Sequence, residues 1–175
     1  MCLVIDTNAF NSVFIKSSDS HEEFEPVLNW ILNGKGKIVY GGSKYREELK
    51  KATKYLRIIS EFNRIRKVVC VDDSLVDKHQ AQVEKTFSHR DFDDPHLVAI
   101  CFVSKCEIIC TKDERANPFL AKKEFYPKNS PRPKLYTGKR NSDLLLDRYL
   151  ANVCLPCEKL TKERAKAFER STGLM

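Results

Sequence analysis

Hydrophobic positions follow two patterns along the first two thirds of the chain. Short, mainly apolar runs occur at residues 3–5, 37–40, 68–71 and 107–111. Such runs are typical of buried strands, because β-branched and aliphatic side chains suit a sheet that is covered on both faces. The segments between them carry apolar residues every three or four positions, which is helical spacing. Alternating strands and helices predict a three-layer α/β/α fold with a mainly parallel central sheet.

The predicted helices have recognisable ends. The first ends near Ile15, Gly34 stops the second, and Ser74 with Asp77 has the spacing of a capping box. The last third of the chain is looser, and its prolines indicate an extended arm with an edge strand near residues 134–137. The longer predicted helices lie at residues 22–33, 43–67, 72–87, 95–105, 143–153 and 161–171.

The long helix predicted at residues 43–67 distinguishes two neighbouring acids. Its apolar positions fall within about 40° of one line on a helical wheel. They are Tyr45, Leu49, Ala52, Leu56 and Ile59. Glu48 lies about 60° from Tyr45, whereas Glu47 lies about 200° from it, among lysines. Glu48 is therefore predicted to point toward the core and Glu47 toward solvent.

The composition is that of one globular domain, with 175 residues, 42% hydrophobic and 31% charged. No apolar run approaches the ~20 residues that a membrane span needs, and the N-terminus lacks the pattern of a signal peptide. The 7 cysteines are odd in number, and Cys70, Cys101 and Cys110 lie in apolar runs. Buried thiols in a reducing compartment fit this better than a disulfide framework, so the sequence predicts a cytoplasmic protein.

The net charge of +7 is concentrated in the last third of the chain. Residues 119–175 hold 13 of the 31 basic residues but only 6 of the 24 acidic ones. We therefore divide the chain into a core at residues 1–120 and a basic C-terminal segment at residues 121–175, packed on the core as part of one domain. Nucleic acid is the commonest partner of such a surface, although a solvated tail or an acidic protein partner gives a similar pattern.

Two acids stand just past predicted strands. Asp6 follows the first strand, in LVIDTN, and Asp113 follows the strand EIICT. Taken singly, each is more often a helix cap than a site residue. In an open α/β sheet, however, ligands bind outside the carboxyl ends of the strands, where both acids are expected.

A third acid, Asp94, precedes the apolar segment PHLVAICFV. Because Pro95 suits the first helical position, Asp94 is well placed as an N-cap. The helix that follows must be buried, so this acid is also held at the rim of the core. Asp91 and Asp93 lie earlier in the loop, where solvation is expected.

Four acids are thus attached to elements that draw them toward the core. They are Asp6, Glu48, Asp94 and Asp113. Carboxylates in one pocket repel each other, and a hard divalent cation relieves the repulsion. An all-oxygen site favours Mg²⁺ or Mn²⁺, whereas zinc would require His or Cys ligands, and the 4 histidines are scattered along the sequence.

The order and spacing of four motifs resemble the PIN-domain family of ribonucleases over about residues 2–120. The motifs are VIDTN, KYREEL, DPHLVAIC and IICTKDE. The resemblance implies a compact parallel sheet between helices, with acids that hold one or two Mg²⁺ or Mn²⁺ ions. The chain departs from a minimal family member by continuing well past the last motif.

The resemblance also assigns roles to individual residues. The implied catalytic metal ligands are Asp6, Glu48, Asp94 and Asp113. Asn8 and Thr111 match polar positions that hydrogen-bond around the site. Two adjacent acids, Asp93 and Asp94, stand where the family pattern usually has one, and Asp93 is therefore included as a supporting residue.

The implied activity is divalent-metal-dependent endoribonuclease activity, the hydrolysis of RNA phosphodiester bonds. Asp6 would be the central bridging ligand, Glu48 would bind metal or orient the attacking water, and the basic segment would hold RNA. Many short family members are toxins of toxin–antitoxin pairs and form dimers, so an antitoxin protein and a second copy are further expected partners; no membrane partner is expected. Two alternatives remain, an RNA-processing factor and a non-catalytic nucleic-acid-binding module of the same fold.

Two other interpretations are weaker. A phosphoacceptor receiver domain needs an acidic pair after its first strand, where this chain has Asp6 alone. The C-x-x-C formed by Cys154 and Cys157 suits a redox pair or half of a zinc site, but no second pair has suitable spacing. We interpret this motif as incidental packing.

Overall fold

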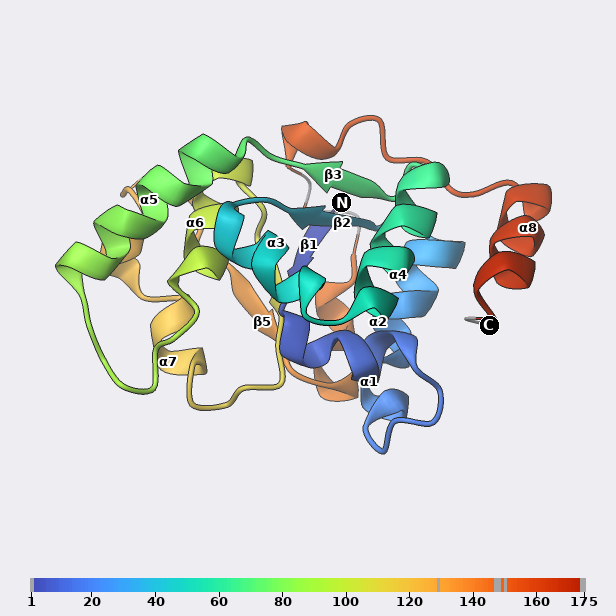
Figure 1. Cartoon of the computed structure of the whole chain (residues 1–175), viewed down its shortest axis with the longest axis horizontal. Coiled ribbons are helices and arrows are strands. Elements are labelled where there is room, and N and C mark those ends of the chain that lie inside the picture. Colours follow the sequence, from blue (N-terminus) through green and yellow to red (C-terminus); the bar gives the residue numbers. More distant parts are fainter. Residues whose placement is uncertain (1, 129, 147–148, 150, 174–175) are drawn as a thin grey trace.

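The computed structural model describes residues 2–128, 130–146, 149 and 151–173. Its parallel strands form one sheet in the order β3-β2-β1-β4-β5, and helices flank the sheet (Figure 1). The strands are β1 (Cys2–Ile5), β2 (Lys37–Tyr40), β3 (Val68–Cys70), β4 (Ile108–Cys110) and β5 (Lys134–Tyr136). The predicted α/β class with a parallel sheet is confirmed, and the arrangement is compatible with three α/β/α layers.

Helices occupy the connections between strands, and further helices follow β5. The α-helices are α1 (Phe10–Phe14), α2 (His21–Asn33), α3 (Ser43–Lys50), α4 (Thr53–Arg64), α5 (Asp73–Thr86), α6 (Pro95–Ser104), α7 (Asn117–Leu120) and α8 (Lys162–Thr172). Short 3₁₀ helices are η1 (Thr7–Ala9), η2 (Lys123–Phe125), η3 (Lys139–Leu144) and η4 (Asn152–Cys154). α5 and α6 lie against each other at one end of the molecule, and α4 and α8 at the other (Figure 1).

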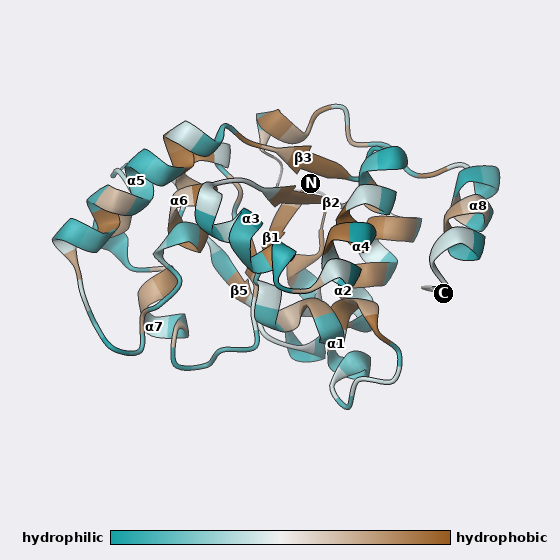
Figure 2. Cartoon of the chain, viewed as in Figure 1, coloured by the Kyte–Doolittle hydropathy of each residue, from teal (hydrophilic) through white to brown (hydrophobic). Residues whose placement is uncertain are grey.

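The core is built on the sheet. Leu3, Val4 and Ile5 of β1 are fully buried, and hydrophobic residues follow the central strands, while the outer helices mix hydrophobic and hydrophilic residues (Figure 2). α6 is apolar on nearly all sides because it contacts β1, β2 and β4 as well as α5. The predicted burial of the segment after Asp94 is therefore confirmed.

The single helix predicted at residues 43–67 is wrong, because the structure divides it into α3 and α4. Ala52 between them is extended, with φ −133° and ψ 101°. Tyr45 and Leu49 are buried as predicted, but Leu56 is 40% exposed. The break turns α4 so that a different stripe faces the core.

Aromatic packing explains the turn of α4. Phe62 is fully buried, with its ring centroid 5.4 Å from that of Phe14 and 4.7 Å from that of Phe168 in α8. Ile58 and Ile59 lie on the same buried side. A straight continuation of α3 would have buried Leu56, so the helical wheel failed at Leu56, although Ile59 is buried as predicted.

The C-terminal segment contributes to the same fold. Its β5 extends the sheet beside β4, as the predicted edge strand required, and α8 matches the helix predicted at residues 161–171. The helix predicted at residues 143–153 is wrong where the structure describes it, since η3 gives way to a non-helical Leu145 with ψ 49°. Residues 147, 148 and 150 of that range lie outside the described residues.

The predicted end of α2 is confirmed, whereas the predicted cap of α5 is wrong. Gly34 terminates α2 as predicted. The cap of α5 is Asp72 rather than Ser74, because the Asp72 carboxylate accepts hydrogen bonds from both the Leu75 amide and the Ser74 hydroxyl.

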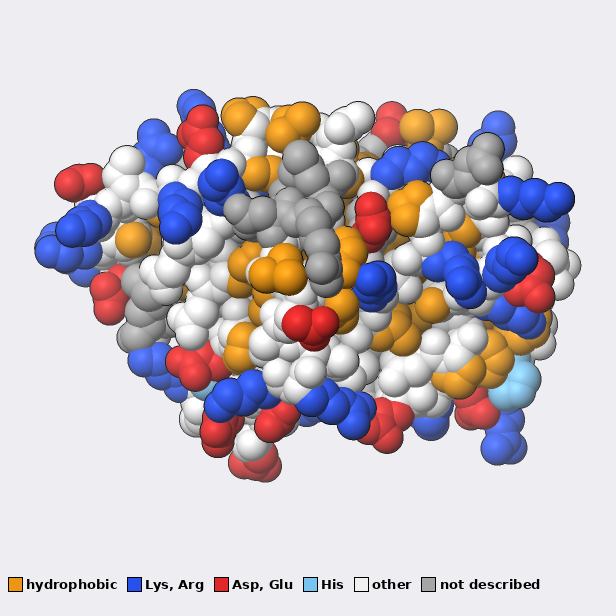
Figure 3. Space-filling model, turned by 180° about the vertical axis from the view of Figure 1, so that it is seen from behind, with side chains coloured by type: hydrophobic (Ala, Val, Ile, Leu, Met, Phe, Trp, Pro, Cys, Tyr) orange, Lys and Arg blue, Asp and Glu red, His pale blue; other side chains and the backbone are white. Residues whose placement is uncertain are grey.

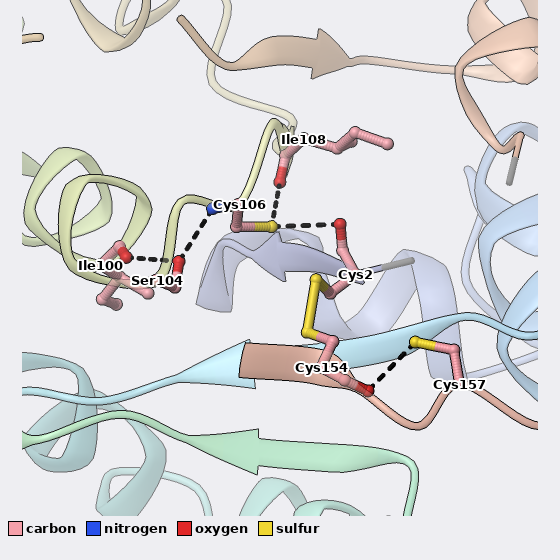
Figure 4. Close-up of a disulfide and its surroundings, with 7 residues drawn as sticks. All are labelled: Cys2, Ile100, Ser104, Cys106, Ile108, Cys154 and Cys157. Carbon is pink, nitrogen blue, oxygen red and sulfur yellow. Dashed lines mark hydrogen bonds between the residues drawn. A yellow bond between two sulfur atoms is a disulfide. The ribbon is translucent and has the colours of Figure 1, made fainter. Parts of the chain in front are cut away.

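The expectation of buried free thiols instead of a disulfide framework is wrong for two of the cysteines. Cys2 at the start of β1 is bonded to Cys154, and their Cα atoms are 6.4 Å apart (Figure 4). Cys157 does not pair with Cys154 but donates a hydrogen bond to its carbonyl oxygen. The motif is therefore not incidental packing, since one of its cysteines ties the C-terminal segment to the first strand.

The burial of the remaining cysteines depends on the strand or helix that carries each of them. Cys101 and Cys110 are buried free thiols, as predicted. Cys70 is exposed instead of buried, because β3 is an edge strand. Within the described part of the chain, no helix combines the length and apolar character required for a membrane crossing.

Candidate metal centre

The strand order creates a crevice between two strands that are distant in sequence. β1 and β4 are neighbours, with Ile5 beside Cys110, while the chain leaves them toward opposite edges of the sheet. Crevices at such a reversal of strand order are where open α/β sheets bind ligands. Asp6 and Thr111 are the residues that follow these two strands.

Asp6 is the most enclosed of the predicted acids, with 2% of its surface exposed. The Thr111 hydroxyl donates to Asp6 Oδ2 at 2.7 Å, and the Asn8 amide donates to Oδ1 at 3.1 Å. The Asn8 side chain accepts from the Lys112 amide at 3.2 Å, which joins the two loops. Asn8 and Thr111 thus hydrogen-bond around Asp6 where the sequence placed them.

α3 brings Glu48 to the same crevice. Gly42, with φ +85°, allows the helix to begin directly after β2, and the Tyr45 hydroxyl donates to the Ile5 carbonyl at the end of β1. Glu48 Oε2 accepts a hydrogen bond of 2.8 Å from the Thr7 hydroxyl, while Glu47 is exposed. The helical wheel distinguished Glu47 from Glu48 correctly because both acids lie within α3, before the break at Ala52.

Asp94 occupies the N-cap position of α6, yet its side chain makes no capping hydrogen bond. Its carboxylate instead lies near other acids. Asp94 and Asp113 form a group with Asp93 in which one oxygen from each lies within 4.8 Å of the others. Asp93 itself is exposed, as expected.

Asp113 is held by a residue that the sequence reading missed. Arg115 donates to both of its carboxylate oxygens, from Nε at 3.1 Å and from Nη2 at 2.8 Å. The Asp113 amide in turn donates to the Thr111 hydroxyl at 3.0 Å. A cation that binds Asp113 must therefore share this carboxylate with Arg115 or displace the guanidinium.

His96 is the second residue that was missed. It is fully buried, and both ring nitrogens lack a hydrogen-bond partner among the described residues. Nε2 is 3.5 Å from Glu48 Oε2, and Nδ1 is 4.0 Å from Asp94 Oδ1. Glu48, Asp94 and His96 form a second group with ligand atoms within 4.8 Å. The scatter of the histidines along the sequence therefore did not exclude a histidine from the site.

The acids open into one polar cavity of about 450 Å³. Its lining residues are Asp6, Thr7, Asn8, Glu48, Lys51, Ala52, Tyr55, Asp93, Asp94, Asp113 and Arg115. The four predicted acids therefore meet in one place. Asp94 belongs to both ligand groups, whereas Asp6 belongs to neither because it lies deeper.

Burial makes two of these acids hard to ionise. Burial, with smaller contributions from Glu48 and Asp113, raises the pKa of Asp6 from 3.8 to about 6, although Thr111 and Asn8 act the other way. Burial and the charge of Asp6 raise the pKa of Asp94 to about 7. The folded chain therefore bears an electrostatic penalty when both are ionised.

The other two acids ionise readily. Burial opposes ionisation of Glu48, but the nearby His96 ring and the hydrogen bond from the Thr7 hydroxyl bring its pKa below the usual value. The Arg115 side chain lowers the pKa of Asp113. Glu48 and Asp113 therefore carry charge readily at neutral pH, whereas burial opposes the ionisation of Asp6 and Asp94.

These features fit a divalent cation. Ligands on opposite sides of an octahedral Mg²⁺ are ~4.2 Å apart, close to the 4.8 Å limit within each ligand group. A cation would offset the cost of ionising Asp6 and Asp94, and it would give His96 a partner. The group of Asp93, Asp94 and Asp113 supplies oxygen ligands alone, whereas the His96 nitrogen widens the choice of metal to include Zn²⁺.

Comparison with protein-family models, curated proteins and solved structures finds no match.

Proposed function

We propose that the chain is a PIN-like endoribonuclease that uses Mg²⁺ or Mn²⁺ to hydrolyse RNA. The observation that carries the proposal is the meeting of Asp6, Glu48, Asp94 and Asp113 in an open cavity at the reversal of strand order. Repelling carboxylates of this kind call for a hard cation, and all-oxygen cation sites are common in phosphoryl chemistry. Asp94 is central in the proposal because it belongs to both ligand groups.

The residues divide into ligands and positioning groups. Asp94 and Asp113 would bind the cation, with Asp6 as a further carboxylate of the site. When bound, the cation would lower the pKa of a water and neutralise charge that develops on the phosphate. Glu48 would accept a hydrogen bond from the attacking water, and the Thr7 hydroxyl holds the Glu48 carboxylate in place.

Arg115 and Lys51 supply positive charge at the rim of the cavity. The Arg115 side chain is 67% exposed, so it can turn from Asp113 toward an incoming phosphate. A guanidinium binds phosphate oxygens in pairs as it binds a carboxylate. In this proposal, Asp113 would give up Arg115 for the metal, and Arg115 would give up Asp113 for a phosphate of the substrate.

One observation favours the non-catalytic alternative. The Asp113–Arg115 pair neutralises a proposed ligand from within the chain, with two hydrogen bonds. If the pair persists when metal is added, the cavity would bind RNA without cleaving it. Metal-dependent cleavage therefore distinguishes the two functions.

The test is cleavage of a labelled single-stranded RNA at pH 7.5 with Mn²⁺, with Mg²⁺ and with EDTA. Wild type and Glu47→Gln should cleave only with metal, whereas Asp94→Asn and Glu48→Gln should lose at least ~100-fold in rate. The exposed neighbour Glu47 makes a matched control because its substitution removes the same charge from the same helix. Cleavage in EDTA, or cleavage undiminished by Asp94→Asn, would overturn the proposal.

A toxin role is a narrower form of the same proposal. Expression of an active toxin should arrest growth, and Asp94→Asn should relieve the arrest. Continued growth with an enzyme shown to be active would favour an RNA-processing role instead.

A further inference from the structure

A second cavity lies at the opposite ends of the strands from the acids. It has a volume of about 160 Å³ and lies between the core and the C-terminal segment. It is lined by Lys37, Ile65, Arg66, Lys67, Pro156, Glu158, Lys159, Leu160 and Arg164. Lys37 begins β2, and Lys67 immediately precedes β3. Basic residues from three parts of the chain therefore face one small space.

Lys67 is the buried base of this cavity, with 1% of its surface exposed. Its ammonium donates to the carbonyl oxygens of Gly34 and Glu158, each at 2.9 Å. These neutral acceptors hold the ammonium in place but do not cancel its charge. Within the described residues, Lys67 has no carboxylate within ion-pair distance.

Lys37 adds a second ammonium beside the first. It is 9% exposed and makes no hydrogen bond or ion pair through its side chain within the described part of the chain. Burial and the charge of Lys37 lower the pKa of Lys67 to about 8, while Cys157 opposes the shift. Buried like charges without a counter-ion are costly, and an anion between them would relieve the cost.

The surroundings extend this charge to the surface. Lys and Arg side chains gather at the end of the molecule that carries α8 (Figure 3, upper left). Arg66, Lys159 and Arg164 complete the cavity wall, where Glu158 is the acidic residue of the lining. A tetrahedral oxyanion can accept from several such donors at once.

We propose that this cavity binds a phosphate group. Drug-sized ligand pockets usually occupy ~300 Å³ or more, so a cavity of 160 Å³ suits a single anionic group better than a whole nucleotide. The group can belong to a free phosphate or to an RNA strand. The second source rests on the proposed function, whereas the first does not.

The position of α4 makes an RNA source geometrically reasonable. Tyr55 near its start lines the acidic cavity, and Ile65 at its end lines the basic one. The 12 residues of α4 span ~18 Å at 1.5 Å per residue. An RNA strand that follows this helix could place one phosphate in the basic cavity and another at the metal centre.

In the first experiment, the intact protein is titrated with inorganic phosphate at pH 7.0 and constant ionic strength, and calorimetry measures the binding. Because Lys67 supports two carbonyl groups, its replacement risks the fold. The test variant is therefore the exposed pair Lys159→Gln/Arg164→Gln, with Lys37→Gln as the buried counterpart. The control is Lys85→Gln, an exposed lysine near the end of α5.

We expect Lys37→Gln to weaken phosphate binding by about tenfold, the effect of losing one good charged contact, and the double variant to weaken it by at least as much, while Lys85→Gln has no effect. Asp94→Asn should bind phosphate normally, which separates this cavity from the metal centre. If free phosphate does not bind, a single-stranded RNA oligonucleotide should bind, with the same pattern among the variants. Absence of binding to both probes, or equal loss in Lys85→Gln, would overturn the proposal.

Discussion

Replacing Asp6 with Asn tests the electrostatics of the acidic cavity in the absence of metal. Burial raises the pKa of Asp6 from 3.8 to about 6, so the folded chain favours the protonated form. Stability is therefore lost as pH rises from about 4 through 6, and the full cost persists above that range. A shift of about two pKa units corresponds to about 3 kcal/mol. Asn has nearly the same shape and carries no charge.

We expect Asp6→Asn to raise the free energy of unfolding by about 2–3 kcal/mol at pH 7.5 in EDTA, and by only about 0.5 kcal/mol at pH 4. The Asn oxygen can still accept from the Asn8 amide, and its NH₂ group can donate to the Thr111 hydroxyl. Urea unfolding at both pH values measures the effect. The exposed Asp19→Asn is the control for removal of an acid.

Added Mn²⁺ should narrow the difference in stability. Wild type gains about 2.7 kcal/mol at a hundredfold excess of metal over its Kd, whereas the variant gains less. A variant no more stable than wild type at pH 7.5 in EDTA, or equally stabilised at pH 4, would refute the reasoning about buried charge.

Three further changes probe other parts of the structure. Glu48→Gln should weaken Mn²⁺ binding about tenfold in calorimetry while Glu47→Gln does not; equal effects would contradict the inward orientation of Glu48. Arg115→Met should raise the pKa of Asp113 and free its carboxylate. Mn²⁺ should therefore bind severalfold tighter at pH 7.5, and acidification should release it at a higher pH than from wild type. Weaker binding would mean that Arg115 supports the site. Cys154→Ser opens a disulfide that links residues 152 apart, and the loss of loop closure should cost up to about 5 kcal/mol in chemical unfolding; a reductant should destabilise wild type but not the variant, and no difference between oxidised and reduced wild type would contradict the bond.

The sequence predicted the features that depend on local pattern. Strand-forming runs and helical spacing indicated the parallel sheet, and two strand ends located Asp6 and Asp113. The wheel placed Glu48 correctly because Tyr45 and Leu49 share its short helix. It failed at Leu56, where tertiary packing of Phe62 against other aromatic rings overrides the continuation of the helix.

Features that depend on distant contacts were not visible. His96 reads as one apolar-helix residue in DPHLV, and only the position of α3 brings Glu48 to within 3.5 Å of its ring. Arg115 was missed as well, because its position two residues after Asp113 does not show that its side chain turns back onto the Asp113 carboxylate. The Cys2–Cys154 bond could not be deduced either, because cysteine spacing does not give connectivity.

Direct measurement of Mn²⁺ binding by electron paramagnetic resonance at pH 7.5 tests the metal centre most simply. The wild type should deplete the signal of free Mn²⁺, and Asp94→Asn, which removes the carboxylate shared by both ligand groups, should reduce the affinity at least ~10-fold. Equal affinity in the two proteins, or no binding by the wild type, would contradict the account.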